Sequence, residues 1–320
     1  MIRTKLTDMF GLQHPLILAP MGGVAGGALA AAVSNAGGLG LVGGGYGDRE
    51  WLRTELSVVK AGTKRPWGVG LITWSIEPDV LDLALSYRPD AFILSFGDPR
   101  PHVPAIRKAG CRLICQVQDL AQAKLAAAAG ADLIVAEGNE AGGHSGTRGT
   151  LPFVPAVVDA VAPLPVVAAG GIADGRGLAA ALALGAQGAL LGTRFYASTE
   201  ALGHARAKAR LVAGAGDDTV RTRVFDVVRG YPWPREFPGR ALRNTFVERW
   251  QGREDDLITR LENEQSAYQN AARSGDTDVA VVWAGEAIDL ITSIESAAAL
   301  VSRISSEAEA QIRNVAGTVK

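Results

Sequence analysis

The chain is poor in cysteine and in aromatic residues. Only two cysteines, Cys111 and Cys115, and 6% aromatic residues occur among its 320 residues, which excludes a small disulfide-stapled fold. The two cysteines lie in or beside one expected strand, where side chains four residues apart point the same way but are too far apart to bridge. We therefore expect reduced thiols and a cytoplasmic protein.

Excess charge of one sign and long apolar runs are also scarce. Lys and Arg total 32 against 33 Asp and Glu, a net charge of −1, so neither a nucleic-acid partner nor a polybasic membrane surface is indicated. The uncharged run that most resembles a membrane span, residues 177–193, is interrupted by Gly185, Gln187 and Gly188 and is shorter than the roughly 20 apolar residues that cross a bilayer. The N-terminal MIRTKLTDMF has no apolar core of a secretion signal, so secretion is not expected.

What the chain does have is a recurrent alternation of short apolar runs with Ala- or Leu-rich stretches of helical character. Continuous apolar runs are typical of buried parallel strands, and their alternation with helices implies crossovers, so the fold class predicted is α/β, a closed (β/α)8 TIM barrel. The eight runs are PLILAPM (15–21), LGLVGGG (39–45), WGVGLIT (67–73), AFILSFG (91–97), RLICQV (112–117), DLIVAEG (132–138), PVVAAGG (165–171) and GALLGT (188–193). We expect the barrel over residues 1–198 and a mainly helical extension over residues 199–320, packed on the barrel as a lid.

The extension is rich in arginine. Two interpretations remain open: a solvated surface of helices packed on the barrel, or a docking surface for a phosphate-bearing substrate. The arginines in question are residues 221, 223, 229, 235, 240, 243, 249 and 253.

Glycine motifs follow the last two expected strands. In a TIM barrel a phosphate commonly lies at the loops after strands 7 and 8, where this chain has AAGGIADG (168–175) and LGTRF (191–195). Gly170 and Gly171 allow close backbone approach, and Gly192 with Thr193 adds amide and hydroxyl donors, so the pattern predicts an anion site. The chain has no G-x-x-x-x-G-K-[ST] element, so a nucleoside triphosphate site is not expected.

One of only four histidines lies in the loop after the sixth expected strand. His144 follows Glu137 within AEGNEAGGHSG, and an imidazole at the catalytic end of a barrel can move a proton near neutral pH. We expect the other three, His14, His102 and His204, to be surface or capping residues. No His, Cys, Asp and Glu cluster has metal-ligand spacing, so no metal is expected, and there is no G-x-S-x-G nucleophile motif. The remaining interpretation is acid–base chemistry beside a phosphate-anchored organic cofactor.

Three blocks of the chain resemble one known family. The segments LAPMGGVAGGALAAAVSNAGGLG, AEGNEAGGHSG and VVAAGGIADGRGLAAALALGAQGALLGTRF closely resemble the FMN-dependent nitronate monooxygenases, formerly called 2-nitropropane dioxygenases. The resemblance covers the whole expected barrel. Beyond about residue 201 it is limited to VVWAGEAIDLI.

The resemblance implies that FMN lies across the barrel mouth. His144 matches the family's catalytic histidine. By the same match, Pro20, Met21 and Gly22 border the flavin ring, Gly142 and Gly143 line the flavin site, and Gly170, Gly171, Gly192 and Thr193 hold the phosphate. Gln116 occupies a position near the flavin where relatives often have Lys or Thr, and Glu137 occupies one where an acid is common.

The chain departs from this family pattern at two positions. Many relatives have GVN on the third strand where this chain has GVG, so Gly70 predicts that a flavin- or substrate-facing amide is missing. Gln116 in place of a lysine predicts the absence of a positive charge that stabilises reduced flavin.

The favoured function is therefore oxidation of alkyl nitronates, and also of nitroalkanes, by O2 to a carbonyl compound and nitrite. The first alternative is an NAD(P)H-driven reductase of the same fold, related to the type II enoyl-acyl-carrier-protein reductases or to the quinone reductases, and the second is a flavin-binding module without turnover. The physiological substrate and the oligomeric state stay open. Aromatic candidates for the barrel mouth are Trp74, Phe96, Tyr196, Trp233 and Phe237, with packing in the core as the alternative.

Overall fold

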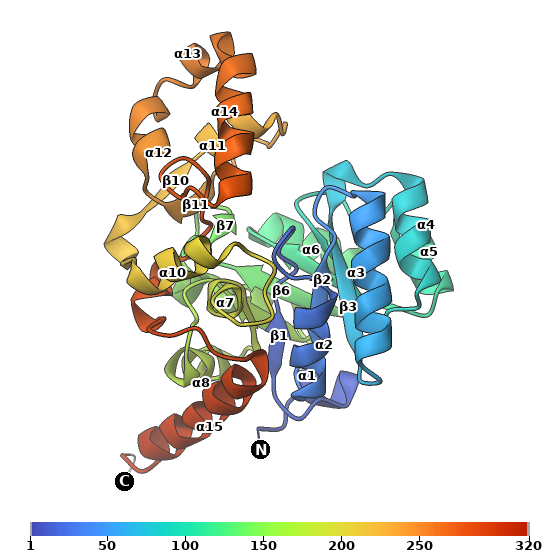
Figure 1. Cartoon of the computed structure of the whole chain (residues 1–320). Helices are drawn as coiled ribbons and strands as arrows, with labels where there is room; N and C mark the ends of the chain where they lie inside the picture. The colour runs from blue at the N-terminus through green and yellow to red at the C-terminus, as the bar shows by residue number, and fades with distance from the viewer. Residues whose placement is uncertain (1, 319–320) are drawn as a thin grey trace.

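A computed structural model describes residues 2–318 of the chain. Eight parallel strands form one sheet in the order β1-β9-β8-β6-β5-β4-β3-β2, and a further bridge joins Ile17 of β1 to Leu39 beside β2. The first and second strands therefore meet, and the expected TIM barrel is confirmed (Figure 1). All eight apolar runs contain a barrel strand: β1 (Leu16–Leu18), β2 (Gly40–Gly43), β3 (Trp67–Ile72), β4 (Ala91–Ser95), β5 (Arg112–Val117), β6 (Leu133–Glu137), β8 (Val166–Ala169) and β9 (Ala189–Leu191).

The barrel interior is filled by alternate strand residues, because successive side chains of a strand point to opposite faces. Ile17, Ile93 and Val135 belong to this inner apolar cluster. Leu6 and Phe10 of the helix α1 (Lys5–Phe10) join the same cluster. The first helix thus closes the amino end of the barrel with apolar side chains, and the carboxyl ends of the strands are left for a ligand.

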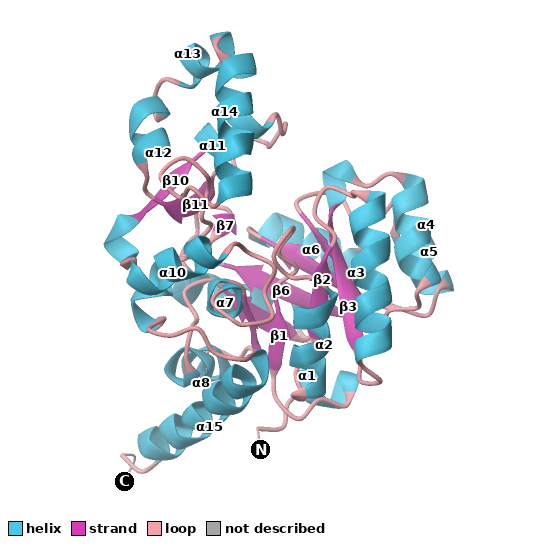
Figure 2. Cartoon of the chain, in the orientation of Figure 1, coloured by secondary structure: helices cyan, strands magenta, loops and turns pink. Residues whose placement is uncertain are grey.

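Helices cover the outside of the barrel (Figure 2). A helix lies between each pair of consecutive barrel strands, as the alternation predicted. Three of the helices begin at an aspartate whose carboxylate accepts hydrogen bonds from first-turn amides, as N-caps do: Asp48, Asp119 and Asp174. The barrel helices are α2 (Gly27–Asn35), α3 (Arg49–Gly62), α4 (Pro78–Ser86), α5 (Val103–Lys108), α6 (Leu120–Ala128), α7 (Thr150–Val161), α8 (Gly175–Ala183) and the short α9 (Thr193–Tyr196).

The residues after α9 are mainly helical, as expected, but they occupy two places. The last helix returns to the barrel, where it packs between α8 and α2, and its Leu300 and Ile304 belong to the main apolar core. Ala207 and Leu211 of the helix at 205–213 belong to the same core, whereas the helices within residues 224–274 form a separate lobe near the barrel mouth (Figure 1). The boundary at residue 198 stays a prediction. The helices after α9 are α10 (Ala205–Ala213), α11 (Val224–Arg229), α12 (Thr245–Trp250), α13 (Glu254–Thr259), α14 (Leu261–Ser274) and α15 (Ala297–Ala316).

A small antiparallel sheet that the sequence did not predict joins the lobe to the barrel. Its strands are β10 (Thr219–Thr222), β11 (Gly239–Leu242) and β7 (Gly143–His144), in the order β10-β11-β7. β7 belongs to the loop after β6, and its His144 is paired with Gly239. The loop that carries the histidine is therefore fixed by backbone pairing to a segment almost a hundred residues later.

Both cysteine thiols are free and buried, as expected. Burial raises the pKa of Cys111 to about 11 and that of Cys115 to about 12, so both thiols stay protonated near neutral pH. No helix within residues 2–318 is both long and apolar enough to span a membrane.

Candidate functional site

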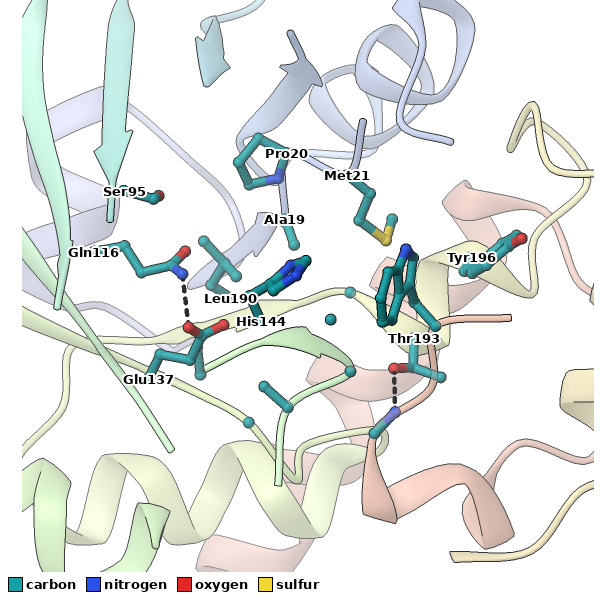
Figure 3. Close-up of a pocket in the computed structure, with 18 of the residues that line it drawn as sticks. Ala19, Pro20, Met21, Ser95, Gln116, Glu137, His144, Leu190, Thr193 and Tyr196 are labelled. Atoms are coloured by element: carbon teal, nitrogen blue, oxygen red, sulfur yellow. Dashed lines mark hydrogen bonds between the residues drawn. The ribbon is translucent and has the colours of Figure 1, made fainter. Parts of the chain in front are cut away.

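A cavity opens at the carboxyl ends of the barrel strands. All twelve site residues expected from the sequence line it, namely Pro20, Met21, Gly22, Gln116, Glu137, Gly142, Gly143, His144, Gly170, Gly171, Gly192 and Thr193. Figure 3 shows Gln116 and Glu137 on one side of this cavity, Thr193 and Tyr196 on the other, and His144 between them. Residues that are far apart in sequence thus converge because each follows a barrel strand.

The loops after β8 and β9 present backbone donors to the cavity. Gly170 has φ +94° and Gly171 φ +70°, left-handed conformations that favour glycine. Three N–H groups on these loops donate to no acceptor within residues 2–318: those of Gly171, Gly192 and Thr193. Unpaired amides that line one cavity form a nest suited to an anion such as a phosphate.

Thr193 adds a hydroxyl to this set of donors. Its Oγ1 accepts a hydrogen bond from the amide of Gly285 at 3.0 Å (Figure 3). Because the oxygen is already used as an acceptor, the hydroxyl proton is available to donate to a ligand in the cavity.

The loop after β1 packs tightly against the next two strands. A Cβ added at Gly70 would lie 2.5 Å from Cβ of Pro20, and a Cβ at Gly43 would lie 2.4 Å from the backbone of Met21. The glycine at position 70 is therefore required by the position of Pro20. The family asparagine expected at this position would not fit without moving that loop.

Glu137 at the end of β6 is a buried acid that is held by two amides. Its Oε2 accepts hydrogen bonds from Nε2 of Gln116 at 2.7 Å and of Gln118 at 3.2 Å. Burial raises the pKa of Glu137 to about 8, and the two glutamines oppose this only in part. At neutral pH this wall of the cavity is largely uncharged, and the Gln116 amide is engaged with Glu137.

His144 is held by residues of the lobe. Its Nε2 lies 2.9 Å from Oδ1 of Asp226 in α11, and its ring stacks on Trp233, with centroids 3.4 Å apart and planes 4° apart. Burial lowers the pKa of His144 below its ordinary value, an effect that Asp226 opposes and Arg229 adds to. The imidazole is therefore neutral near pH 7 and able to accept a proton.

Aromatic side chains line the outer part of the cavity. Of the five candidates from the sequence, Phe96, Tyr196 and Trp233 line it directly. Trp74 and Phe237 lie behind these, in ring contact with Trp233 and Phe96 respectively. Phe96 has φ +63°, a conformation that is uncommon for a residue with a side chain and is found at functional sites.

Two arginines of the arginine-rich extension form hydrogen bonds with backbone carbonyls of a barrel loop. Arg221 donates to the carbonyl of Ser145 at 2.8 Å. Arg240 donates to the carbonyl of Asn139 at 3.0 Å and pairs with Glu286 at 2.7 Å. Both contacts with carbonyls hold the loop between β6 and α7, which carries His144.

Several cavity residues were missed in the sequence. Tyr46 and Trp283 line the cavity, and Asp226 contacts His144 from 82 positions away. Arg229 also lines the cavity, and it belongs to the arginine-rich set for which a docking role was one open interpretation. The segment around Asp226 offered only a general excess of arginine, and VVWAGEAIDLI, which contains Trp283, was the one family-like segment beyond the barrel. That segment was a signal for Trp283, and no comparable signal marked Tyr46 or Asp226.

Comparison with known proteins gives one family match over nearly the whole chain. The sequence model of the family described as nitronate monooxygenase matches residues 3–79 and 73–307. A nitronate monooxygenase of Neurospora crassa is 34% identical over 360 residues, which cover 98% of this chain and 94% of the relative.

Two further proteins that resemble this chain have other names. A Mycobacterium tuberculosis protein named (3aS,4S,5R,7aS)-5-hydroxy-7a-methyl-1-oxo-octahydro-1H-indene-4-carboxyl-CoA dehydrogenase is 37% identical over 256 residues, covering 78% of this chain and 68% of the relative. The solved structure of FabK from Thermotoga maritima superposes with a TM-score of 0.89 at 32% identity and covers 100% of both chains.

Proposed function

Because this chain belongs to the nitronate monooxygenase family, we propose that it is an FMN-dependent monooxygenase that oxidises alkyl nitronates with O2 to a carbonyl compound and nitrite. The family is one of flavin-dependent oxidoreductases. The observation that carries the proposal is the convergence of all twelve expected site residues on one cavity with His144 in its wall.

The residues present fit a flavin mononucleotide. The unpaired amides of Gly171, Gly192 and Thr193, together with the adjacent Gly170, would hold the phosphate. The ring would lie beside the segment 20–22 and the glycines 142 and 143, which present backbone and little side chain to a flat ligand. At Gly143 a Cβ would meet no atom within 4 Å, so the cavity has open space beside this glycine.

Gln116 and Glu137 would lie beside the same flavin. Glu137 is largely protonated at neutral pH because of its burial, so this wall would add little negative charge to the cofactor's surroundings. The missing lysine is thus partly offset by the protonation of its neighbour.

The chain's own part in the reaction is proton handling and charge placement. His144 would accept the α-proton of a neutral nitroalkane, since its lowered pKa keeps the imidazole unprotonated. A nitronate has already lost this proton, so His144 and Arg229 would then orient the anion. Arg229 lines the cavity and stacks on Tyr231 at 4.7 Å. When bound, FMN supplies the electron transfer between substrate and O2.

The aromatic wall would keep water from the reacting atoms. Trp233 is buried, and its Nε1 donates to the hydroxyl of Tyr46 at 2.8 Å. This bond joins the lobe to the loop after β2 across the mouth of the cavity. A dry cavity strengthens the electrostatic interactions within it.

A second candidate is an NAD(P)H-driven reductase on the same flavin. It is favoured by the superposition on FabK over both whole chains and by the similarity to a CoA-ester dehydrogenase. The reacting partner of the flavin differs between the two candidates, which makes them separable.

Anaerobic mixing of the holoenzyme separates the two candidates. Propyl nitronate is expected to change the visible flavin absorbance, and NADH or NADPH is expected to leave it unchanged. Admission of air should then release nitrite and propanal from the nitronate sample. Bleaching by a reduced nicotinamide, with no response to the nitronate, would overturn the proposal in favour of the reductase.

A further inference from the structure

The lobe supplies a buried carboxylate to the barrel histidine. Asp226 Oδ1 lies 2.9 Å from His144 Nε2, and the two side chains are only 4% and 8% exposed. Asp226 is on α11, outside the barrel, whereas His144 is on β7 in the loop after β6. The pair therefore forms only when lobe and barrel are folded together.

This contact determines where the proton of the neutral imidazole lies. An ionised carboxylate can only accept a hydrogen bond, so Nε2 must carry the proton and donate it to Asp226. The other nitrogen, Nδ1, then keeps its lone pair. A histidine ring nitrogen is commonly selected in this way by the partner of the opposite nitrogen.

We propose that Asp226 is a positioning residue that holds His144 in its Nε2–H form and so makes Nδ1 the atom that accepts the substrate proton. The base role rests on the proposed function, whereas the proton position on the ring does not. When Nδ1 takes the proton, the C–H bond of the substrate breaks, its electron pair stays on the substrate as the nitronate, and the imidazole becomes a cation beside the aspartate.

Asp226 is also placed to stabilise that cation. Its second oxygen, Oδ2, is buried and has no hydrogen-bond partner within the described residues, so its negative charge is not shared with another donor. Arg229, one helical turn along the same helix, is the other charged group that acts on His144, and it opposes protonation. Three aromatic rings also lie against the imidazole, those of Phe96, Trp233 and Trp283, and none of them is titratable.

The ring is held by three separate contacts from the lobe. Pairing of β7 with β11 fixes the backbone of His144, Trp233 stacks on the imidazole, and Asp226 binds its edge. A ring fixed in this way has little freedom to turn, and because Nε2 is bound to Asp226, Nδ1 would be the nitrogen left for a ligand of the cavity that His144 lines. Such preorganisation is typical of a catalytic base that is oriented by a third group.

Nitrogen NMR on the full-length protein labelled in histidine tests the proton position directly. The chain has four histidines, and the signal lost in His144→Gln identifies the relevant ring. We expect the neutral ring of the unmodified protein to give the Nε2–H pattern. An Nδ1–H pattern would overturn the proposal, whatever the protein does with nitro compounds.

The Asp226→Asn variant tests the effect of the carboxylate. Removing its charge leaves burial and Arg229 as the acting causes, so the pKa of His144 should fall below that of the unmodified protein. An unchanged pKa in a folded variant would contradict the proposal. Thermal unfolding shows whether Asp226→Asn is folded. If it is not folded, Asp226→Glu is used in its place, and its His144 ring should keep the Nε2–H form.

Kinetics with two substrates distinguish a role in proton transfer from a merely structural role, because only one of the substrates needs a base. With nitroethane, which needs a base, Asp226→Asn should lower kcat/KM by about 10- to 100-fold and move the rising limb of the pH profile to lower pH. With ethyl nitronate, which needs none, the change should be only a few-fold. Equal losses on both substrates with an unmoved profile would contradict the proposal.

A matched control is Asp256→Asn in α13 of the same lobe, which removes an exposed pairing with Arg253. It should leave both substrates and the histidine signals unchanged. If the protein turns over no nitro compound at all, the proposed function fails. The tautomer and pKa measurements would still decide the role of Asp226.

Discussion

The indole of Trp233 lies flat against the imidazole of His144, with ring centroids 3.4 Å apart and planes 4° apart. One ring comes from a proline-rich loop of the lobe and the other from a barrel loop. The stack covers one face of the imidazole and, with the bond from Trp233 to Tyr46, ties three segments together above the cavity. The lobe is therefore part of the architecture of the cavity.

Removal of the indole should restore the proton affinity of the histidine. In Trp233→Ala, water reaches the ring of His144, and because burial is the largest cause of its lowered pKa, that pKa should rise toward the ordinary value near 6.5. Histidine NMR or the pH profile of nitroethane turnover measures the change. Trp233→Phe keeps an aromatic cover while losing the bond to Tyr46 and should shift the pKa less; a larger shift in Trp233→Phe would refute this explanation.

Replacement of His144 should separate cofactor binding from turnover. His144→Ala removes the proposed base but none of the amides of the phosphate site, so the protein should keep its flavin while nitroethane turnover falls by about 100- to 10,000-fold. Oxygen uptake and flavin absorbance measure the two properties. His204→Ala is the control, since His204 caps α10 by accepting from the amide of Arg206 and does not line the cavity. Loss of colour in His144→Ala would place the residue in cofactor binding instead.

A methyl group in the phosphate site should weaken FMN binding. Gly171→Ala introduces a Cβ at φ +70° that would lie 3.3 Å from Glu140, in the loop whose amides would hold the phosphate. We expect the Kd for FMN to rise by at least about 10-fold, equivalent to about 1.4 kcal/mol. Gly110→Ala has the same left-handed strain, φ +77°, in open space far from these loops. It should lower thermal stability while leaving the Kd unchanged, and equal effects of the two variants on Kd would contradict the assignment.

Glu137 should make stability depend on pH. Its pKa is raised to about 8 in the folded chain from an ordinary 4.5, so between these values the folded protein keeps a proton that the unfolded chain releases. Stability must therefore fall as pH rises through this window. Glu137→Gln removes that dependence and should unfold at a higher temperature than the unmodified protein at pH 9, with a smaller difference at pH 5. Melting curves of both apoproteins at pH 5 and pH 9 measure this difference. If the two proteins differ in melting temperature by the same amount at both pH values, Glu137 is ionised at both and the explanation is wrong.

The barrel and its rim could be predicted from the sequence because their signals are local. Each buried strand is a continuous apolar run, and each predicted rim residue follows such a run directly, so strand ends could be aligned without knowing any contact. Gly170 and Gly171 illustrate this, since their position after the seventh run is enough to place them at the cavity.

The remaining part of the site depends on contacts between distant segments. Asp226 reaches His144 across 82 positions, and the small sheet pairs a two-residue strand with a segment of the lobe, so neither has a periodic pattern of its own. Gly70 shows a different limit. The sequence suggested a missing amide there, whereas the structure shows that a Cβ would lie 2.5 Å from that of Pro20.

The most direct test of the central claim is titration of the apoprotein with FMN, followed by absorbance and by the quenching of flavin fluorescence. We predict saturation at one FMN per chain in the unmodified protein and in His144→Ala, with weakened binding in Gly171→Ala and unaltered binding in Gly110→Ala. A protein that stays colourless at saturating FMN, or whose binding is equally insensitive to both glycine substitutions, would contradict a flavin held by the backbone amides at the barrel rim.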